Sequence, residues 1–146
     1  MITIPKQTVR LVRDGKGTKG PEKLDDPEHA KRVFQTLLAD LPHEELHIIA
    51  IDARHRPIMT CMVGRGGAES LGILSADIFR PLIVAGARGF FIAHNHPSGD
   101  PTPSSADVEI TRQLRQDGDT LQITLLDHIV IADGAAPFSM FQNGVL

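Results

Sequence analysis

The feature that most limits the fold of this chain is the alternation of short apolar runs with segments of helical periodicity. The apolar runs are rich in Ile, Val and Leu, as is typical of β-strands, and they cover residues 46–51, 58–63, 90–93 and 121–131. Helices are expected after Asp26, over 76–87 and over 104–116, and a glycine-rich loop at 64–67. Intermixed strands and helices predict a single α/β (α+β) domain in which helices flank a mixed sheet.

Capping residues and prolines mark the boundaries of these helices. Asp26 is a suitable N-cap, and Pro27 suits the first helical position that follows it. Ser75 is the expected cap of the second helix, although Pro81 is awkward inside it. Gly118 is expected to end the third helix, because glycine is the residue that helices most often use at their C-terminal end.

The length and composition describe one globular domain without covalent cross-links. A chain of 146 residues can bury about 70% of the surface that its unfolded form exposes. Cys61 is the only cysteine, which excludes an internal disulfide and a cysteine-rich zinc site, and we expect it to be a buried apolar side chain. The net charge of −3 and the absence of Trp and Tyr argue against a whole-domain nucleic-acid surface. No apolar run has membrane length and no secretory leader is visible, so a cytoplasmic protein is expected.

Residues 1–26 form a basic stretch at the start of an acidic protein. Up to residue 23, basic residues outnumber Asp14 and Glu22, and glycines interrupt the stretch. We expect a partly flexible N-terminal arm over 1–26, with at most a short edge strand at 8–12, followed by one globular domain over 27–146. The arm has two interpretations, a solvated mobile segment and a segment that contacts phosphate groups, so direct nucleic-acid binding is an open question.

Two histidines and an aspartate form the most informative pattern. His94 and His96 stand at positions i and i+2 at the end of an apolar strand, so strand alternation points both imidazoles to one face. A loop rich in Pro and Gly follows, and Asp107 lies in the first turn of the third helix, from which its carboxylate can return to the histidines. Three nitrogen and oxygen ligands leave the fourth tetrahedral position of a zinc ion for water, as in catalytic zinc sites. Such an ion lowers the pKa of its bound water to about 7.

Each part of this pattern also has an ordinary structural explanation. Ser104-Ser105-Ala106-Asp107 fits a helix capping box in which Asp replaces the usual Glu or Gln. A His-X-His sequence by itself is common on strands. The combination is less expected by chance, and the capping and metal-site interpretations are compatible.

The same residues resemble the signature of the JAMM (MPN-plus) metalloproteases, in which an upstream Glu is followed by His-X-His, seven residues, Ser, two residues and Asp. Seven residues separate His96 from Ser104, and two separate Ser104 from Asp107. The chain is more similar to one branch, the RadC-like JAB domains, whose fingerprint is visible at 94–99, at Pro103-Ser104 and at 126–131. The resemblance extends roughly from Glu44 to the C-terminus.

This resemblance implies a zinc-dependent metallohydrolase with a JAB/MPN-like fold, and specifically a peptidase or isopeptidase. It implies that His94, His96 and Asp107 bind Zn²⁺. It also implies that Ser104 helps to hold the oxyanion of the tetrahedral intermediate. The implied partner of such an enzyme is a peptide or protein substrate.

The family's general base is an upstream glutamate hydrogen-bonded to the zinc-bound water, and Glu44 is the matching residue. Glu45 is the alternative, since both faces of the strand at 46–51 are apolar and the pattern does not decide between them. Asp127 and His128 also belong to the family pattern. They either support a metal-bound histidine by accepting the N–H of its other ring nitrogen, or form a polar pair on a strand whose hydrogen bonds are all made within the fold.

A second function is open beside hydrolysis. The chain would then be a zinc-bearing, DNA-repair-associated interaction module without proteolytic activity, and its partners would be DNA-processing proteins. No spacing connects the other histidines to the site, so surface or packing roles are expected for His29, His43, His47 and His55.

Overall fold

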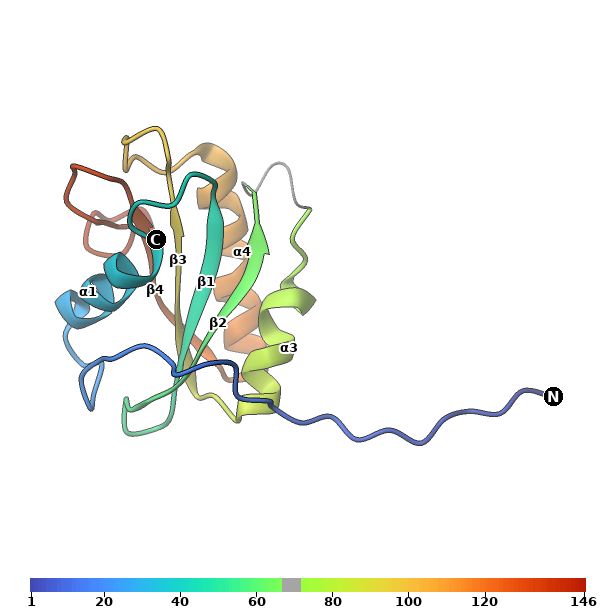
Figure 1. Cartoon of the computed structure of the whole chain (residues 1–146). Helices are drawn as coiled ribbons and strands as arrows, with labels where there is room; N and C mark the ends of the chain where they lie inside the picture. Colours follow the sequence, from blue (N-terminus) through green and yellow to red (C-terminus); the bar gives the residue numbers. More distant parts are fainter. Residues whose placement is uncertain (67–71) are drawn as a thin grey trace.

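Helices are interspersed with strands along the chain in this computed structural model, which describes residues 1–66 and 72–146 (Figure 1). Their order is α1 (Pro27–Leu38), β1 (Glu45–Ile51), β2 (Pro57–Arg65), α3 (Ser75–Ala85), β3 (Gly89–Asn95), α4 (Ser105–Leu121), β4 (Thr124–Ile131) and β5 (Phe138–Ser139). The loop expected at 64–67 is partly strand, because β2 extends to Arg65, and Gly67 lies outside the described residues.

The strands form one mixed sheet in the order β2-β1-β3-β4-β5. β1 is antiparallel to both β2 and β3, whereas β3 and β4 are parallel and α4 makes the crossover between them. α1 packs on one face of the sheet, and α3 and α4 pack on the other (Figure 1). This arrangement confirms the predicted α/β domain with a mixed sheet flanked by helices.

The central strands are buried on both faces, so the sheet has an apolar core on each side. All seven residues of β1 and all seven residues of β3 are buried. The cores include Ile48 and Phe90 beneath α3 and α4, and Ile49 and Phe91 beneath α1. A strand buried in this way is apolar in both phases, so its sequence does not show which face carries a functional side chain.

The helices α1 and α3 begin differently. Asp26 is the N-cap of α1, and its Oδ1 accepts a backbone N–H of the first turn at 2.9 Å, which confirms the prediction. The predicted cap of α3, Ser75, is wrong. Leu74 occupies the N-cap, and its N–H donates to Asp77 Oδ2 at 3.1 Å. The Ser75 hydroxyl donates instead to Asp117 of α4, which links the two helices.

The helix α4 is longer than expected, and the predicted end at Gly118 is wrong. It continues to Leu121, with Gln122 as the C-cap in the left-handed region at φ 58°. A side chain at Gly118 would collide with the carbonyl oxygen of Ile123, whose N–H donates to the Gly118 carbonyl at 2.9 Å. Glycine is therefore needed here because the chain folds back against the helix on its way into β4.

The N-terminal residues are extended and exposed. Residues 1–23 contain no helix or strand, and the first of them run away from the domain (Figure 1). The edge strand expected at 8–12 is wrong, because no neighbouring strand pairs with these residues. Leu24 is buried, and its N–H donates to the carbonyl of His55 at 2.8 Å. Within the described residues, no helix combines the length and apolar character needed to cross a bilayer.

Candidate metal centre

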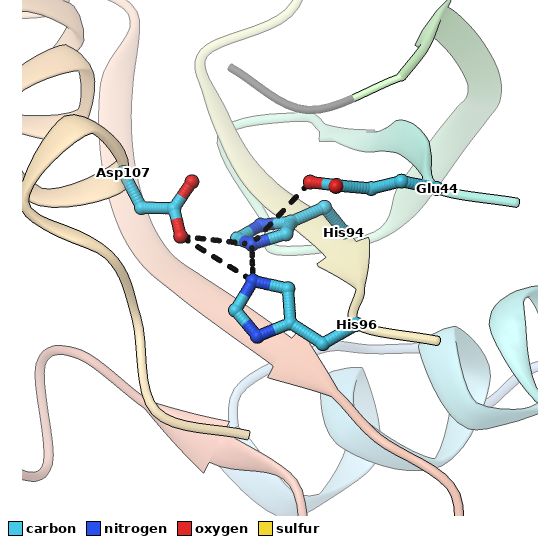
Figure 2. A group of neighbouring side chains, drawn as sticks. All are labelled: Glu44, His94, His96 and Asp107. Atoms are coloured by element: carbon cyan, nitrogen blue, oxygen red, sulfur yellow. Dashed lines mark hydrogen bonds and ion pairs between the residues drawn. The ribbon is translucent and has the colours of Figure 1, made fainter. Parts of the chain in front are cut away.

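Three segments of the chain meet at one edge of the sheet. Because β1 and β3 are antiparallel and Leu46 pairs with His94, the start of β1 lies beside the end of β3. The loop after β3 returns the chain to the same edge, where α4 begins. Figure 2 shows that Glu44, His94, His96 and Asp107 point toward one another from these segments. The topology thus brings together residues that are far apart in the sequence.

The donor atoms of His94, His96 and Asp107 form a small triangle. The two Nε2 atoms are 2.9 Å apart, and Asp107 Oδ2 lies 3.2 Å from that of His94 and 3.4 Å from that of His96 (Figure 2). The point in their plane that is equally distant from all three donor atoms lies about 1.8 Å from each of them, which is shorter than a zinc–nitrogen bond of about 2.0–2.1 Å. The triangle is therefore small enough for one zinc ion to bind all three donors without rearrangement.

The start of α4 holds Asp107 in place. Ser104 is the N-cap, and its Oγ accepts the N–H of Asp107 at 3.1 Å, while its own N–H donates to Asp107 Oδ2 at 2.8 Å. The expected capping box is present, and it points the same carboxylate oxygen at the two histidines. Because the Ser104 hydroxyl accepts in this bond, its own proton is available to a further partner.

Asp107 places a buried negative charge beside the histidines, with only 4% of the residue exposed. Burial by itself would raise the pKa of this carboxyl, but the bonds from His94 and His96 and the N–H of Ser104 outweigh burial and hold the pKa well below its usual range. The bond to Asp107 raises the pKa of His96; burial opposes this rise, and the Asp100 carbonyl adds to it. A buried carboxylate between two imidazoles is a donor set that favours a cation.

The outer ring nitrogen of each histidine also has a partner. His96 Nδ1 lies 2.7 Å from the carbonyl oxygen of Asp100. A carbonyl oxygen only accepts, so this Nδ1 carries the proton and Nε2 of the neutral ring keeps a lone pair for a metal. His94 Nδ1 lies 2.7 Å from His128 Nε2, so a second histidine stands behind the first.

Asp127 and His128 have different surroundings, although they are adjacent in the sequence. His128 is 1% exposed and contacts His94. Burial, with the neighbouring charge of His94, lowers the pKa of His128 well below its ordinary value, so this ring is neutral. Asp127 instead accepts the hydroxyl of Ser139 at 2.5 Å and the N–H of Phe141 at 3.1 Å. These bonds attach Asp127 to the C-terminal segment rather than to the clustered histidines.

The two candidate general bases also differ in their surroundings. Glu44 Oε1 lies 4.0 Å from His94 Nε2, and the Glu44 side chain is 24% exposed. Glu45 Oε1 lies 2.8 Å from His43 Nε2, and its Oε2 lies 2.8 Å from His47 Nε2. The fold therefore brings Glu44, and not Glu45, to the donor atoms. His43 and His47, for which only surface or packing roles were expected, hold the Glu45 carboxylate.

Asn95, the residue between the two histidines, clamps the backbone on both sides of Glu44. Its Oδ1 accepts the N–H of Glu45 at 2.7 Å, and its Nδ2 donates to the carbonyl of His43 at 2.9 Å. The Glu44 carbonyl also accepts the N–H of Gly66 at 2.7 Å. The sequence pattern does not indicate this role of Asn95, because its partners lie 50 and 52 residues away and its place inside His-X-His is the only signal.

A small pocket opens beside the donor atoms. Its volume is about 10 Å³, which is room for about one water molecule. Its lining comprises Glu44, Leu46, Gly66, Ile73, Ile92, His94, Asp107 and Ile110. Apolar walls on this scale lower the local dielectric constant and so strengthen the electrostatic interactions of the charged groups that they enclose.

Comparison with known proteins agrees with this architecture. The sequence profile of the RadC-like JAB domain matches residues 24–145. Similar curated proteins, each named a UPF0758 protein, come from Geobacter sulfurreducens (34% identical over 113 residues, 77% of this chain and 49% of the relative), Pelobacter propionicus (31% over 132 residues, 90% and 57%) and Clostridium perfringens (36% over 111 residues, 76% and 49%). The chain spans about half the length of these relatives. With the mixed sheet, the donor cluster and the sequence match in agreement, the chain belongs to the family of RadC-like JAB domains.

Proposed function

We propose that this chain is a zinc-dependent metallohydrolase that cleaves peptide or isopeptide bonds. The observation that carries the proposal is the triangle of His94, His96 and Asp107 donors with the Glu44 carboxylate 4.0 Å from one of them. Three protein donors without a thiolate are typical of catalytic zinc, which keeps one position for water or substrate. Structural zinc is usually closed by four protein ligands, so this donor set favours chemistry over a purely structural role.

Glu44 is the proposed general base. Zinc bound at this site supplies a Lewis acid for the scissile carbonyl and lowers the pKa of a bound water to about 7. The Glu44 side chain is partly exposed and borders the water-sized pocket, so it can accept a proton there and deliver it to the leaving amine. Because both carboxylate oxygens of Glu45 are engaged by His43 and His47, Glu45 is a poor alternative.

Ser104 is the proposed neutral donor to the developing oxyanion. Its hydroxyl accepts the N–H of Asp107, so its proton can turn toward a substrate oxygen. Ser104 also stands at the N-terminus of α4, where the helix dipole favours negative charge.

The wider context of the reaction is also a proposal. The proposed substrate is a peptide or protein, and the proposed compartment is the cytoplasm. DNA-processing partner proteins and phosphate contacts by the basic arm are separate proposals. An arm that contacts phosphate predicts binding that weakens with salt and is lost when residues 1–23 are deleted, and salt-independent binding would exclude that role.

Metal analysis coupled to a peptide-library cleavage screen tests the proposed hydrolase. The wild type should carry about one zinc per chain and cleave a subset of peptides. Glu44→Gln should keep the zinc and lose about 10²–10⁴-fold in cleavage rate, because only the proton acceptor is removed. His96→Ala should lose both zinc and cleavage. Glu45→Gln is the matched control and should keep both.

Two outcomes would contradict parts of this proposal. A Glu44→Gln protein that cleaves as fast as the wild type would show that Glu44 is not the base. A zinc-loaded wild type that cleaves no peptide, with a protein group as the fourth zinc ligand, would support the interaction module instead.

A further inference from the structure

We propose that Thr111, acting through His128, is a positioning residue that fixes which ring nitrogen of His94 is available to the metal. The inference rests on the proposed function in that His94 is taken as a metal ligand. Thr111, His128 and His94 are 0%, 1% and 2% exposed, so bulk water does not replace the partners that they give one another. Their contacts form an unbroken chain from the backbone of Asp107 to the ring of His94.

The Asp107 carbonyl sets the direction of this chain. Thr111 Oγ1 lies 2.5 Å from that carbonyl oxygen. A carbonyl oxygen only accepts, so the single hydroxyl proton of Thr111 must point at it. The same Oγ1 lies 2.5 Å from His128 Nδ1. With its proton already directed at Asp107, the hydroxyl can only accept from His128, and the ring proton of His128 is therefore on Nδ1.

His128 transmits this constraint to His94. A neutral imidazole has one N–H, so His128 protonated at Nδ1 has a lone pair at Nε2. His94 Nδ1 lies 2.7 Å from that lone pair and must donate to it. The Nδ1–H of His94 is thus held on the side of the ring away from the metal site, and Nε2, 3.2 Å from Asp107 Oδ2, is the nitrogen that offers its lone pair when a metal ion binds. A chain of opposite direction would protonate this Nε2 and block coordination.

Thr111 therefore acts on two of the proposed metal ligands at once. Its hydroxyl bonds the backbone of Asp107, and it determines the tautomer of His94 through His128. Thr111 is not part of the His-X-His…Ser-X-X-Asp pattern, and its sequence position indicates only a packing role on the third predicted helix. Partners behind metal-bound histidines typically change metal affinity about 10–100-fold when they are removed.

Zinc affinity of the full chain, measured by competition with a chromophoric chelator, tests this role. Thr111→Val keeps the shape of the side chain and removes the hydroxyl, and it should weaken zinc binding about 10–100-fold. Thr111→Ser keeps the hydroxyl and should restore near-normal affinity. Thr120→Val is the matched control on α4, because the exposed Thr120 also donates to a carbonyl four residues earlier, that of Gln116 at 3.1 Å. Its zinc affinity should match that of the wild type.

The tautomers are read directly from ¹⁵N–¹H spectra of the histidine side chains in metal-free protein. The wild type should carry a proton on Nδ1 of both His94 and His128, and Thr111→Val should lower the fraction of His94 that carries a proton on Nδ1. A wild type in which His94 Nδ1 carries no proton would overturn the proposal even if Thr111→Val did not fold. Unchanged zinc affinity and tautomer in Thr111→Val would also overturn it, while leaving the metal centre intact. A wild type that binds no zinc would instead refute the metal centre itself, and the role of Thr111 with it.

Discussion

Replacing Asn95 by alanine tests whether this side chain holds the backbone around Glu44. The substitution removes the acceptor of the Glu45 N–H and the donor to the His43 carbonyl, which are bonded at 2.7 and 2.9 Å. Asn95 is 3% exposed, and a buried polar group left without a partner costs about 1–3 kcal/mol. The first of the two bonds is buried and the second partly buried, so the combined loss should be about 2–4 kcal/mol.

Urea denaturation measures this loss as a difference in the free energy of unfolding. In a chain of 146 residues each kcal/mol lost from the free energy of unfolding lowers Tm by about 2–4 °C, so Tm in a thermal melt should fall by about 5–15 °C. Asn143→Ala is the matched control. It removes a single bond, from Asn143 Nδ2 to the Ser139 carbonyl at 2.7 Å, and should cost about 1 kcal/mol or less. Zinc affinity should stay near that of the wild type in both variants, since no donor atom changes. An Asn95→Ala protein within about 0.5 kcal/mol of the wild type would refute the reasoning.

Other perturbations act on packing, charge and metal. Gly118→Ala should lower the free energy of unfolding by about 1–3 kcal/mol, because the new Cβ would collide with the backbone that follows α4. A gain in stability, as for an exposed helical glycine, would contradict that packing. Burial alone would raise the pKa of Glu45, but bonds from His47 and His43 outweigh burial and lower it. A carboxyl group whose pKa is lowered in the folded state stabilises the fold at pH values above its unfolded pKa of 4.5. This stabilisation is lost as pH falls through the pKa of the folded state. The wild type should therefore lose stability relative to Glu45→Gln as pH falls below about 4.5, and parallel acid curves would exclude this contribution. Removing metal with EDTA should lower the Tm of the wild type and not that of His96→Ala, since a ligand at 100 times its Kd stabilises by about 2.7 kcal/mol. Equal responses of the two proteins would mean that the metal binds elsewhere.

The candidate donor set could be predicted because its geometry is mostly local. His94 lies on β3, His96 is the first residue after that strand, and Asp107 lies in the first turn of the next helix, so local spacing alone indicates that they converge. The choice between Glu44 and Glu45 could not be made in this way. β1 is buried on both faces, and neither phase of the strand is polar enough to indicate the functional side.

The residues behind the donors depend on tertiary contacts that the sequence does not display. Thr111 reaches His128 across 17 residues, and Asn95 reaches Glu45 across 50. The helix ends likewise divide into those set by local residues and those set by tertiary contacts. The cap at Asp26 is local and was predictable, whereas Gly118 is a glycine because of the backbone that packs against it.

The central claim is that His94, His96 and Asp107 bind one zinc ion and leave a position open for water. Zinc-edge X-ray absorption of the wild type, combined with metal analysis of the wild type and His96→Ala, tests this most directly. We predict about one zinc per wild-type chain, with a first shell of only nitrogen and oxygen at about 2.0–2.2 Å that includes imidazole scattering. A sulfur ligand at about 2.3 Å, or a zinc content that His96→Ala does not reduce, would contradict the claim.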